Sequence, residues 1–526
     1  MKKIIMLVMV IIVIFVGTSI EREKVETLAD KNSRDLITYN MNINPDDLKL
    51  IYSDNRREKD LLVTLFEGLV KENENGQITP ALAREFNVSE DGLQYTFTLR
   101  DDIRYSNGEK IVAKDFKEFF KAFIGDKQNI YAKELDCIFG VKAFREGTGD
   151  FSDVAIVDNG DDVLYIRLNY RCPYFINILT NPVYTLRDYK DLDEYKDKYT
   201  LIRFTGPFII KEANDEELVV ERNDSYYDSD NVTDENIKIS FNESAEKSLA
   251  IFESSNKDYF KNIDMMLDVP SNELLRLAKE GVVKSFKGVS KYYLNFNDND
   301  KSLGSDLNFR NSINSALSKE YYSQIISKEL LSPAIEYVEK SSAVETVFSS
   351  YGHTEKAMAY LKELGLNENS IIKIAYIKNN LNKRIIEELC YDLEKELSIN
   401  IEAKGYTDVE LNDVIKKNEY DVLLQELEFK YRYPGEYYES FSKLSEANII
   451  GYYDTQYEEL LNRARYEMNE NKRNEIYEEC EAIIKRKLNS IPLYDVNIPI
   501  CVKKDISKVY VTTGGNIRLE KVERVP

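Results

Sequence analysis

Hydrophobic and polar residues follow one another along this chain with two clear periods, and the change between them is sharpest within residues 91–123. In residues 93–99 every second side chain is apolar, which is the period of a strand with one buried face. The Ser-Asn-Gly at residues 106–108 favours a tight turn, because Asn and Gly tolerate a positive φ. The phenylalanines of residues 116–123 then recur at helical spacing. This segment therefore predicts a strand, a turn and an amphipathic helix, in that order.

The same two patterns predict further elements over the rest of the chain. Strands are expected at residues 36–40, 291–297, 372–376, 399–403 and 420–424. Helices are expected at residues 62–70, 309–326, 355–364, 384–397, 451–460 and 471–484. Residues 372–403 form a β-α-β unit, in which we expect parallel strands and a right-handed crossover. The pattern as a whole indicates an α/β protein.

Length and composition narrow the classes of protein further. A chain of 526 residues exceeds what one hydrophobic core supports, so we expect two or three domains or lobes. The formal net charge of −22 argues against nucleic acid as a partner, because nucleic-acid binding requires a basic surface. The single histidine, His353, is too few for a metal site built on imidazole. Since no phosphate-binding loop or hydrolase motif occurs either, we expect neither a cofactor nor an enzyme.

The five cysteines are an odd number with wide spacing, at Cys137, Cys172, Cys390, Cys480 and Cys501. They contain no Cys-x-x-Cys pair, which argues against a thiolate metal cluster or a redox motif. One disulfide is possible in an exported chain, but we favour unpaired buried thiols.

The N-terminus carries a basic and then an apolar segment. Lys2 and Lys3 precede an uninterrupted apolar run at residues 4–16, and small or apolar residues continue to Ile20. This pattern is typical of a signal peptide or of an uncleaved signal anchor. We favour a membrane tether, because residues 4–20 reach the lower limit for a span. Residues 21–34 predict a polar linker. Because a signal peptide and a signal anchor both direct export, the body of the chain is expected outside the cytoplasm, at the cell surface.

Several motifs occur in an order that resembles a known family. They are Asp91-Gly92 followed by Tyr95, Phe97 and Leu99-Arg100, then Tyr105-Ser106-Asn107-Gly108, Ala113-Lys114-Asp115-Phe116, Thr205-Gly206-Pro207-Phe208, Lys291 to Asn297, and Ser490-Ile491-Pro492-Leu493-Tyr494. In this order the chain resembles the extracellular solute-binding proteins of family 5, the oligopeptide- and dipeptide-binding proteins of ABC importers. It departs from the family at Tyr105, where Trp is usual, and at Val112, where Thr would cap a helix. The family's lipid anchor is excluded, because no cysteine precedes Cys137.

The resemblance implies a two-lobe fold of the periplasmic-binding-protein type (type II, cluster C-like) with an extra subdomain in the first lobe. The first lobe is expected at residues 35–270, with the subdomain at about residues 60–155. The second lobe is expected at residues 271–489, after which residues 490–526 return to the first. The ligand of this family, commonly an extended peptide, is enclosed between the lobes by hinge closure.

Candidate ligand-binding residues follow from their positions relative to the expected cleft. They are Tyr39, Asn40, Tyr105, Tyr131, Tyr292 and Tyr293. Each of the tyrosines can equally be a core aromatic residue, since its ring is apolar and its hydroxyl needs only one partner.

The segment at residues 424–438 departs most from the family. Where the family often has an Asp that pairs with a peptide's ammonium group, this chain has Lys430, followed by Tyr431. A lysine repels an ammonium group and attracts a carboxylate. Glu426 and Glu428 could take the place of the Asp if the register differs by two residues, and Lys430 could also lie on the surface of a shifted loop.

The leading hypothesis is the extracytoplasmic substrate-binding component of an ABC importer, which binds oligopeptides and delivers them to a permease. Its implied partners are a peptide, the permease subunits and, through the N-terminal segment, the membrane, and we expect a monomer. The alternative is a membrane-tethered peptide sensor or scaffold that kept the fold but lost transport. The missing lipid anchor and Lys430 favour this alternative. A hydrolase is a weaker hypothesis, because many carboxylates are expected in any acidic chain.

Overall fold

The computed structural model describes residues 36–233, 236–242, 244–254, 262–337, 348, 351–429 and 433–525. The expected signal segment at residues 1–20 and the linker at residues 21–34 lie outside them. Among the described residues, no helix has both the length and the apolar character needed to cross a membrane.

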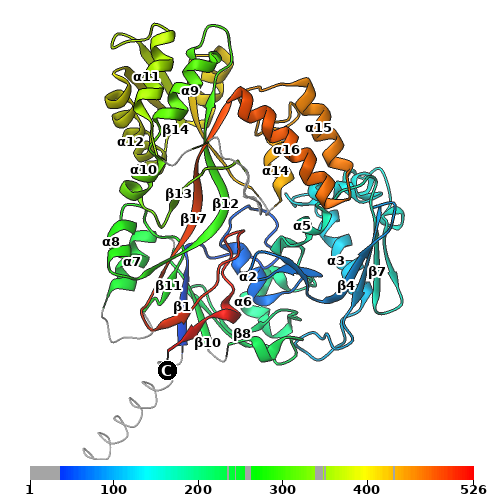
Figure 1. Ribbon diagram of the computed structural model, residues 1–526. Coiled ribbons are helices and arrows are strands. Elements are labelled where there is room, and N and C mark those ends of the chain that lie inside the picture. The colour runs from blue at the N-terminus through cyan, green and yellow to red at the C-terminus, as the bar shows by residue number, and fades with distance from the viewer. Residues whose placement is uncertain are drawn as a thin grey trace, which may run out of the picture.

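A large mixed sheet runs through the whole molecule (Figure 1). Its strands are β1 (Leu36–Met41), β8 (Phe208–Ala213), β9 (Glu217–Arg222), β10 (Asn236–Phe241), β11 (Met265–Met266), β12 (Val283–Phe296), β13 (Leu331–Pro333), β14 (Ile371–Ile377), β15 (Asn400–Tyr406), β16 (Val422–Leu427) and β17 (Ser490–Val502). They lie in the order β15-β14-β16-β12-β17-β11-β1-β10-β9-β8, and β13 pairs with β17 outside this path.

Two long strands, β12 and β17, join the two halves of the sheet. They pair antiparallel from Val283 opposite Cys501 to Asn295 opposite Ser490, with a register shift between Lys287 and Lys291. One half packs into a core built on β1 and β8 to β10, and the other into a core built on β12, β14 and β16. The molecule therefore has two α/β lobes connected by two strands, as expected (Figure 1).

The second lobe carries most of the long helices. They are α9 (Leu307–Ala316), α10 (Lys319–Ile326), α11 (Thr354–Glu363), α12 (Asn380–Leu397), α13 (Asp408–Lys417), α14 (Pro434–Glu439), α15 (Thr455–Tyr466) and α16 (Glu470–Lys487). The expected β-α-β unit is present, since β14 and β15 are parallel and α12 connects them. The prediction of a single helix at residues 309–326 is wrong. Leu317 has an extended backbone, so the chain forms α9 and α10 instead.

The first lobe contains a separate four-stranded sheet, in the order β4-β5-β7-β6. Its strands are β4 (Ala83–Val88), β5 (Gln94–Leu99), β6 (Ile156–Asn159) and β7 (Val163–Arg167). The helices α3 (Ala113–Gly125) and α4 (Val141–Glu146) lie between β5 and β6 in the chain. The burial of β5 alternates, and α3 buries its phenylalanines, as their periods predict. Val112 offers no side-chain cap to α3, but the Asp115 carboxylate accepts the Val112 N–H at 2.9 Å. The proposed domain boundaries stay a prediction.

The remaining α-helices and strands of the described chain are short. They are α2 (Glu58–Leu65), β2 (Val70–Glu72), β3 (Ile78–Pro80), α5 (Phe175–Leu179), α6 (Tyr195–Lys198), α7 (Ala245–Glu253), α8 (Leu274–Lys279), β18 (Ile506–Lys508) and β19 (Glu523–Arg524). The helix expected at residues 62–70 ends earlier, at Leu65, because Phe66 is extended and Gly206 donates its N–H to the Leu65 carbonyl at 3.0 Å.

Gly206 allows this contact because it has no side chain. A Cβ atom placed there would lie 2.5 Å from the Phe66 nitrogen and 2.6 Å from the Leu65 carbonyl carbon. We expect Gly206→Ala to lower the free energy of unfolding by about 1–3 kcal/mol, since backbone atoms have to move. Urea unfolding measures the change. Gly125→Ala is the matched control, because its Cβ would meet only the Phe144 ring at 3.5 Å. Equal stability of the two variants would contradict this account.

Candidate functional site

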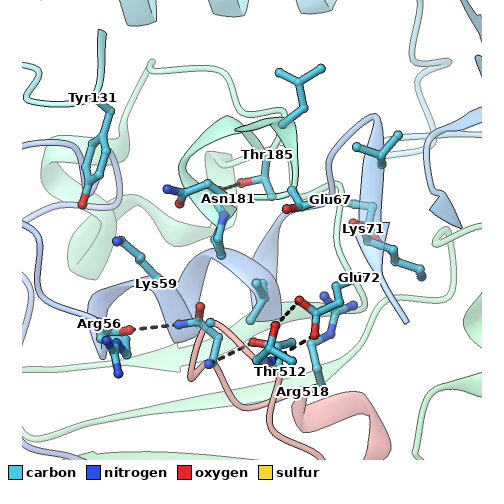
Figure 2. A pocket seen from close by; sticks show the side chains of 18 of the residues that line it. Arg56, Lys59, Glu67, Lys71, Glu72, Tyr131, Asn181, Thr185, Thr512 and Arg518 are labelled. Carbon is cyan, nitrogen blue, oxygen red and sulfur yellow. Dashed lines mark hydrogen bonds and ion pairs between the residues drawn. The ribbon is translucent and has the colours of Figure 1, made fainter. Parts of the chain in front are cut away.

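A pocket of about 190 Å³ lies where the two lobes meet (Figure 2). The first lobe supplies most of its wall, from the start of α2, from residues 67–72, from Tyr131 and from residues 179–185. The second lobe supplies Glu428 and Phe429, which follow β16. The C-terminal segment at residues 512–518 forms a third side. The pocket is thus assembled from segments that are distant in the sequence.

The charges that line the pocket are balanced in number. Four acidic residues face four basic ones: Asp54, Glu67, Glu72 and Glu428 against Arg56, Lys59, Lys71 and Arg518. The side chains of Asp54 and Glu428 are 64% and 66% exposed, whereas that of Lys59 is 14% exposed. The two exposed carboxylates are therefore accessible to a bound molecule.

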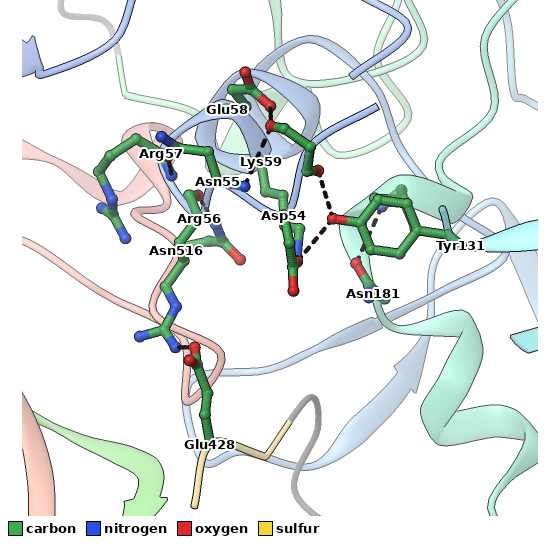
Figure 3. A network of polar contacts seen from close by, with 12 residues as sticks. Asp54, Asn55, Arg56, Arg57, Glu58, Lys59, Tyr131, Asn181, Glu428 and Asn516 are labelled. Atoms are coloured by element: carbon green, nitrogen blue, oxygen red, sulfur yellow. Dashed lines mark hydrogen bonds and ion pairs between the residues drawn. The ribbon is translucent and has the colours of Figure 1, made fainter. Parts of the chain in front are cut away.

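Tyr131 and Lys59 form one wall of the pocket together with Asp54 (Figure 3). The Tyr131 hydroxyl donates to the Asp54 carboxylate at 2.8 Å and lies 2.9 Å from the Ser53 carbonyl. Lys59 pairs with Asp54 at 2.6 Å, and its Nζ lies 5.0 Å from the centre of the Tyr131 ring. Burial, followed by Asp54, raises the pKa of Tyr131, so this hydroxyl keeps its proton at neutral pH.

Arg56 and Glu428 join the two lobes across the pocket (Figure 3). The Arg56 guanidinium forms an ion pair with the Glu428 carboxylate. Burial and the neighbouring Arg57 lower the pKa of Arg56, while Glu426 of the second lobe opposes that shift. Arg56 is therefore a cation of the first lobe that pairs with a carboxylate of the second, Glu428.

Asp60 positions the start of α2 and the C-terminal segment relative to each other. It is buried, and its carboxylate accepts from the Tyr39 hydroxyl at 2.5 Å and from Arg57 at 3.0 Å. The same carboxylate accepts from the Asn516 amide at 3.0 Å and from the Ile517 N–H at 3.2 Å. Asn516 also donates to the Arg56 carbonyl at 3.0 Å. Two pocket residues, Arg56 and Asn516, are thus held by one buried carboxylate.

Buried ion pairs occupy the far end of the pocket (Figure 2). Glu67 accepts from the Tyr226 hydroxyl at 2.6 Å and from Lys71 at 3.4 Å. Burial alone would lower the pKa of Lys71, but Glu67 raises it to about 12. Burial likewise acts to raise the pKa of Glu67, but Lys71 and Arg518 hold it below its ordinary value. Both groups are therefore charged at neutral pH and neutralise each other.

A second contact between the lobes joins the start of α14 and the end of α15 to the segment before α5. The rings of Tyr174 and Tyr433 lie 5.2 Å apart, and those of Tyr170 and Tyr466 lie 6.5 Å apart. Tyr170 and Tyr174 belong to the segment that leads into α5 and then into the pocket wall at residues 179–185. These ring contacts therefore connect the second lobe to the segment that continues into this wall.

Of the residues predicted from the sequence to bind ligand, Tyr131 and Glu428 line the pocket. Tyr39 lies beneath it and donates to Asp60. Asn40 is buried and accepts from Ser240 and Asn242. Neither Tyr39 nor Asn40 is part of the pocket lining. Ligand contact by any of these residues stays a prediction.

The other predicted tyrosines pack in the cores of the two lobes. Tyr105 is buried in the first lobe, where the Arg203 guanidinium lies 4.3 Å from its ring centre. Tyr292 donates to Glu426 at 2.8 Å, and burial raises the pKa of Glu426. Tyr293 is buried and stacks on Tyr437. Lys430 and Tyr431 lie outside the described residues, so their expected roles remain predictions.

Most of the polar lining comes from three segments that carry no recognised binding motif. These are residues 54–59, 179–185 and 512–518. The first is a run of charged residues before a helix, which is a visible signal, but a solvated helix start has the same appearance. The other two carry no pattern that distinguishes them from ordinary loops.

A family model, related sequences and solved structures all indicate similarity to bacterial solute-binding proteins. The family model described as bacterial extracellular solute-binding proteins, family 5 middle, matches residues 77–448. The oligopeptide-binding protein OppA of Bacillus subtilis is 25% identical over 488 residues, which is 88% of each chain. Among solved structures, the periplasmic murein tripeptide binding protein MppA in its unliganded open form has a TM-score of 0.80 at 19% identity, covering 93% of this chain and 98% of that one. Peptide-bound OppA of Listeria monocytogenes has a TM-score of 0.62 at 18% identity, covering 94% and 99%.

Proposed function

The chain belongs to the bacterial extracellular solute-binding proteins of family 5, and from this premise we infer that it binds oligopeptides between its lobes and delivers them to the permease of an ABC importer. Its relatives include an oligopeptide-binding and a dipeptide-binding protein of Bacillus subtilis. They give no support to the alternative of a sensor that has lost transport.

The pocket between the lobes is the observation that carries this proposal. It presents hydrogen-bonding groups and charges of both signs, whereas an extended peptide offers main-chain donors and acceptors along its length and one charge at each end. Asp54 and Glu428 are accessible partners for an ammonium group, and Arg56, whose side chain is 35% exposed, is one for a carboxylate. Main-chain groups are the same in every peptide, so such a site binds peptides with loose sequence preference.

The two lobes are arranged as in a protein ready to receive a ligand. The TM-score is higher with the solved structure titled open and unliganded than with the one titled bound to peptide, 0.80 against 0.62, which supports an open arrangement here. The strands β12 and β17 form the connection about which the lobes close. Closure changes the outer surface of both lobes, and that change is the signal a permease can recognise.

We place the mature chain outside the cytoplasm as a monomer. Residues 1–20 then direct export, and in the uncleaved form they tether the chain to the membrane. Deletion of residues 1–34 is expected to release the chain from membranes without changing its peptide affinity.

Peptide binding and its location are tested with one variant and a matched control. We expect the chain to form a saturable one-to-one complex with peptides and to return them unaltered, as native mass spectrometry would detect. Tyr131→Ala is expected to weaken binding roughly tenfold, about 1.4 kcal/mol, because it removes both the ring and the hydroxyl from the pocket wall. Tyr391→Ala, in a 63% exposed residue of α12, should leave affinity unchanged. Failure to bind any peptide contradicts the function, and equal affinity of the two variants contradicts the location.

A further inference from the structure

Glu428 of the second lobe already has a cationic partner inside the pocket (Figure 3). The Arg56 guanidinium of the first lobe pairs with its carboxylate. The side chains of Arg56 and Glu428 are 35% and 66% exposed, so a ligand reaches both of them. A cationic group that enters the pocket therefore meets a carboxylate whose charge the chain itself has neutralised.

The backbone of Arg56 is held by the C-terminal loop at residues 511–517, which an antiparallel bridge closes at its ends. The Asn516 amide donates to the Arg56 carbonyl at 3.0 Å. The next residue, Arg57, donates from its guanidinium to the Gly515 carbonyl at 2.5 Å. Because the start of α2 and this loop bind each other in two places, the Arg56 side chain extends from a fixed backbone.

The side chain of Arg56 lies across Gly515. A Cβ atom at Gly515 would be 2.7 Å from the Arg56 Cδ and 3.3 Å from its Nη1. Gly515 also has a φ of 85°, which glycine adopts without the steric cost that a side chain brings. The absence of a side chain here therefore allows the turn and makes room for the guanidinium that pairs with Glu428.

Glu428 is held in a similar way by the second lobe. Leu427, the residue before it, is the last of β16 and lies opposite Lys291 of β12. Phe429, the residue after it, packs its ring against that of Tyr437 in α14, with 6.1 Å between the ring centres. Each partner of the ion pair is therefore positioned by contacts within its own lobe.

The ion pair of Arg56 and Glu428 differs from its neighbour in the pocket. Lys59 and Asp54 both belong to the first lobe, so they stay together when the lobes move. Arg56 and Glu428 belong to different lobes, which β12 and β17 connect. Exposed ion pairs are weak, so another cation can take the place of the guanidinium at Glu428.

On the premise of the peptide binding proposed above, we propose that Arg56 is a specificity-determining residue, because it competes with the cationic group of a ligand for Glu428. A peptide with a free amino terminus gains this carboxylate only by displacing the guanidinium. A peptide with a blocked amino terminus leaves the ion pair intact. Arg56 therefore reduces the advantage of a charged amino terminus, and the site accepts both kinds of peptide.

Competition between peptides measures this specificity. The probe is an equimolar pool of random pentapeptides with free and with acetylated amino termini. The readout is the ratio of free to acetylated peptide that the purified chain retains, quantified by mass spectrometry. Arg56→Gln is expected to raise this ratio about fivefold, which corresponds to the upper end of the range for an exposed ion pair. Arg56→Lys keeps a competing cation and should stay within about twofold of the native ratio. Arg84→Gln, at a 47% exposed residue outside the pocket lining, should leave the ratio unchanged.

The same substitution in a Glu428→Gln background separates competition for Glu428 from a general effect of charge. In that background Arg56→Gln is expected to leave the ratio of free to acetylated peptide unchanged, because the carboxylate for which the two cations compete is absent. An equal rise in both backgrounds, or no rise when Glu428 is present, would overturn the proposal.

A measurement without any peptide tests the contact itself. The double variant Arg56→Cys with Glu428→Cys is treated with a short bismaleimide, and peptide mapping is expected to find residues 56 and 428 linked in the folded chain but not in urea. A missing link in the folded chain contradicts the proposal even if the chain binds peptides. A link in a chain that retains no peptide from the pool supports the contact between the lobes and contradicts only the proposed function.

Discussion

Replacing Asp60 with alanine is expected to destabilise the chain by about 3–5 kcal/mol, because one buried carboxylate neutralises or accepts from several buried groups. Its loss leaves the Arg57 guanidinium without its ion-pair partner and the Tyr39 hydroxyl and Asn516 amide without an acceptor. Burial raises the pKa of Asp60, and Arg57 and Tyr39 oppose that shift, so the charge depends on these partners. Urea unfolding measures the loss of stability.

The same substitution is also expected to weaken peptide binding, since Asp60 holds the pocket residue Asn516 and, through it, the backbone of Arg56. Asp60→Asn keeps the shape of the side chain but removes its charge. Its free energy of unfolding and its peptide affinity should lie between those of the native chain and of the alanine variant. Asp101→Ala is the control. The Asp101 side chain is 82% exposed, and its ion pair with Arg84, at 3.5 Å, contributes little because both groups are in contact with water. If Asp60→Ala were as stable as Asp101→Ala, the central role of this carboxylate would be wrong.

Lys319 is expected to make the stability of the chain rise with pH. It is fully buried at the start of α10, and its ammonium group donates to the carbonyls of Ala334 at 2.8 Å and Pro492 at 2.5 Å. Burial, followed by the charge of Lys291, lowers the pKa of Lys319 from 10.5 to about 7. Between these two values the unfolded chain binds a proton that the folded chain has released. Raising the pH therefore disfavours unfolding, by up to about 1.4 kcal/mol per pH unit.

Urea unfolding between pH 7 and pH 9 measures this slope in the native chain and in Lys319→Met, which removes the charge at similar length. The variant should lack the contribution of Lys319, so its free energy of unfolding should rise less steeply with pH. The unpaired carbonyls in the variant shift its curve by a constant amount and leave the slope unaffected. Lys356→Met, at an exposed residue of α11, is expected to keep the native slope. Parallel curves for the native chain and Lys319→Met would refute the prediction.

Local elements were predictable where a period in the sequence reflects burial of one face. The alternation of β5 and the phenylalanine stripe of α3 are such cases, and both elements lie within a residue or a few residues of their expected bounds. The errors occurred where a contact from elsewhere ends an element. The helix α2 ends at Leu65 because the backbone of Gly206 packs there, and no pattern within residues 62–70 records that neighbour.

The candidate site was predictable only in part. The chain has 37 tyrosines, and a tyrosine in a core resembles one in a cleft, since each buries its ring and needs one partner for its hydroxyl. Tyr131 lines the pocket, whereas Tyr292 and Tyr293 are packed in the second lobe. Their residue type and sequence neighbours are similar, so only the fold separates them.

By itself the sequence determined several strands and helices with a clear period, the α/β class, the resemblance to family 5 and the two crossings between the lobes that it implies. These follow from periods and motifs that are local in the chain. The tertiary structure alone decided which charges face one another, such as Arg56 and Glu428, and which loops meet at the pocket. The physical reason is that these contacts join segments distant in the sequence, and packing of the whole fold sets their distance.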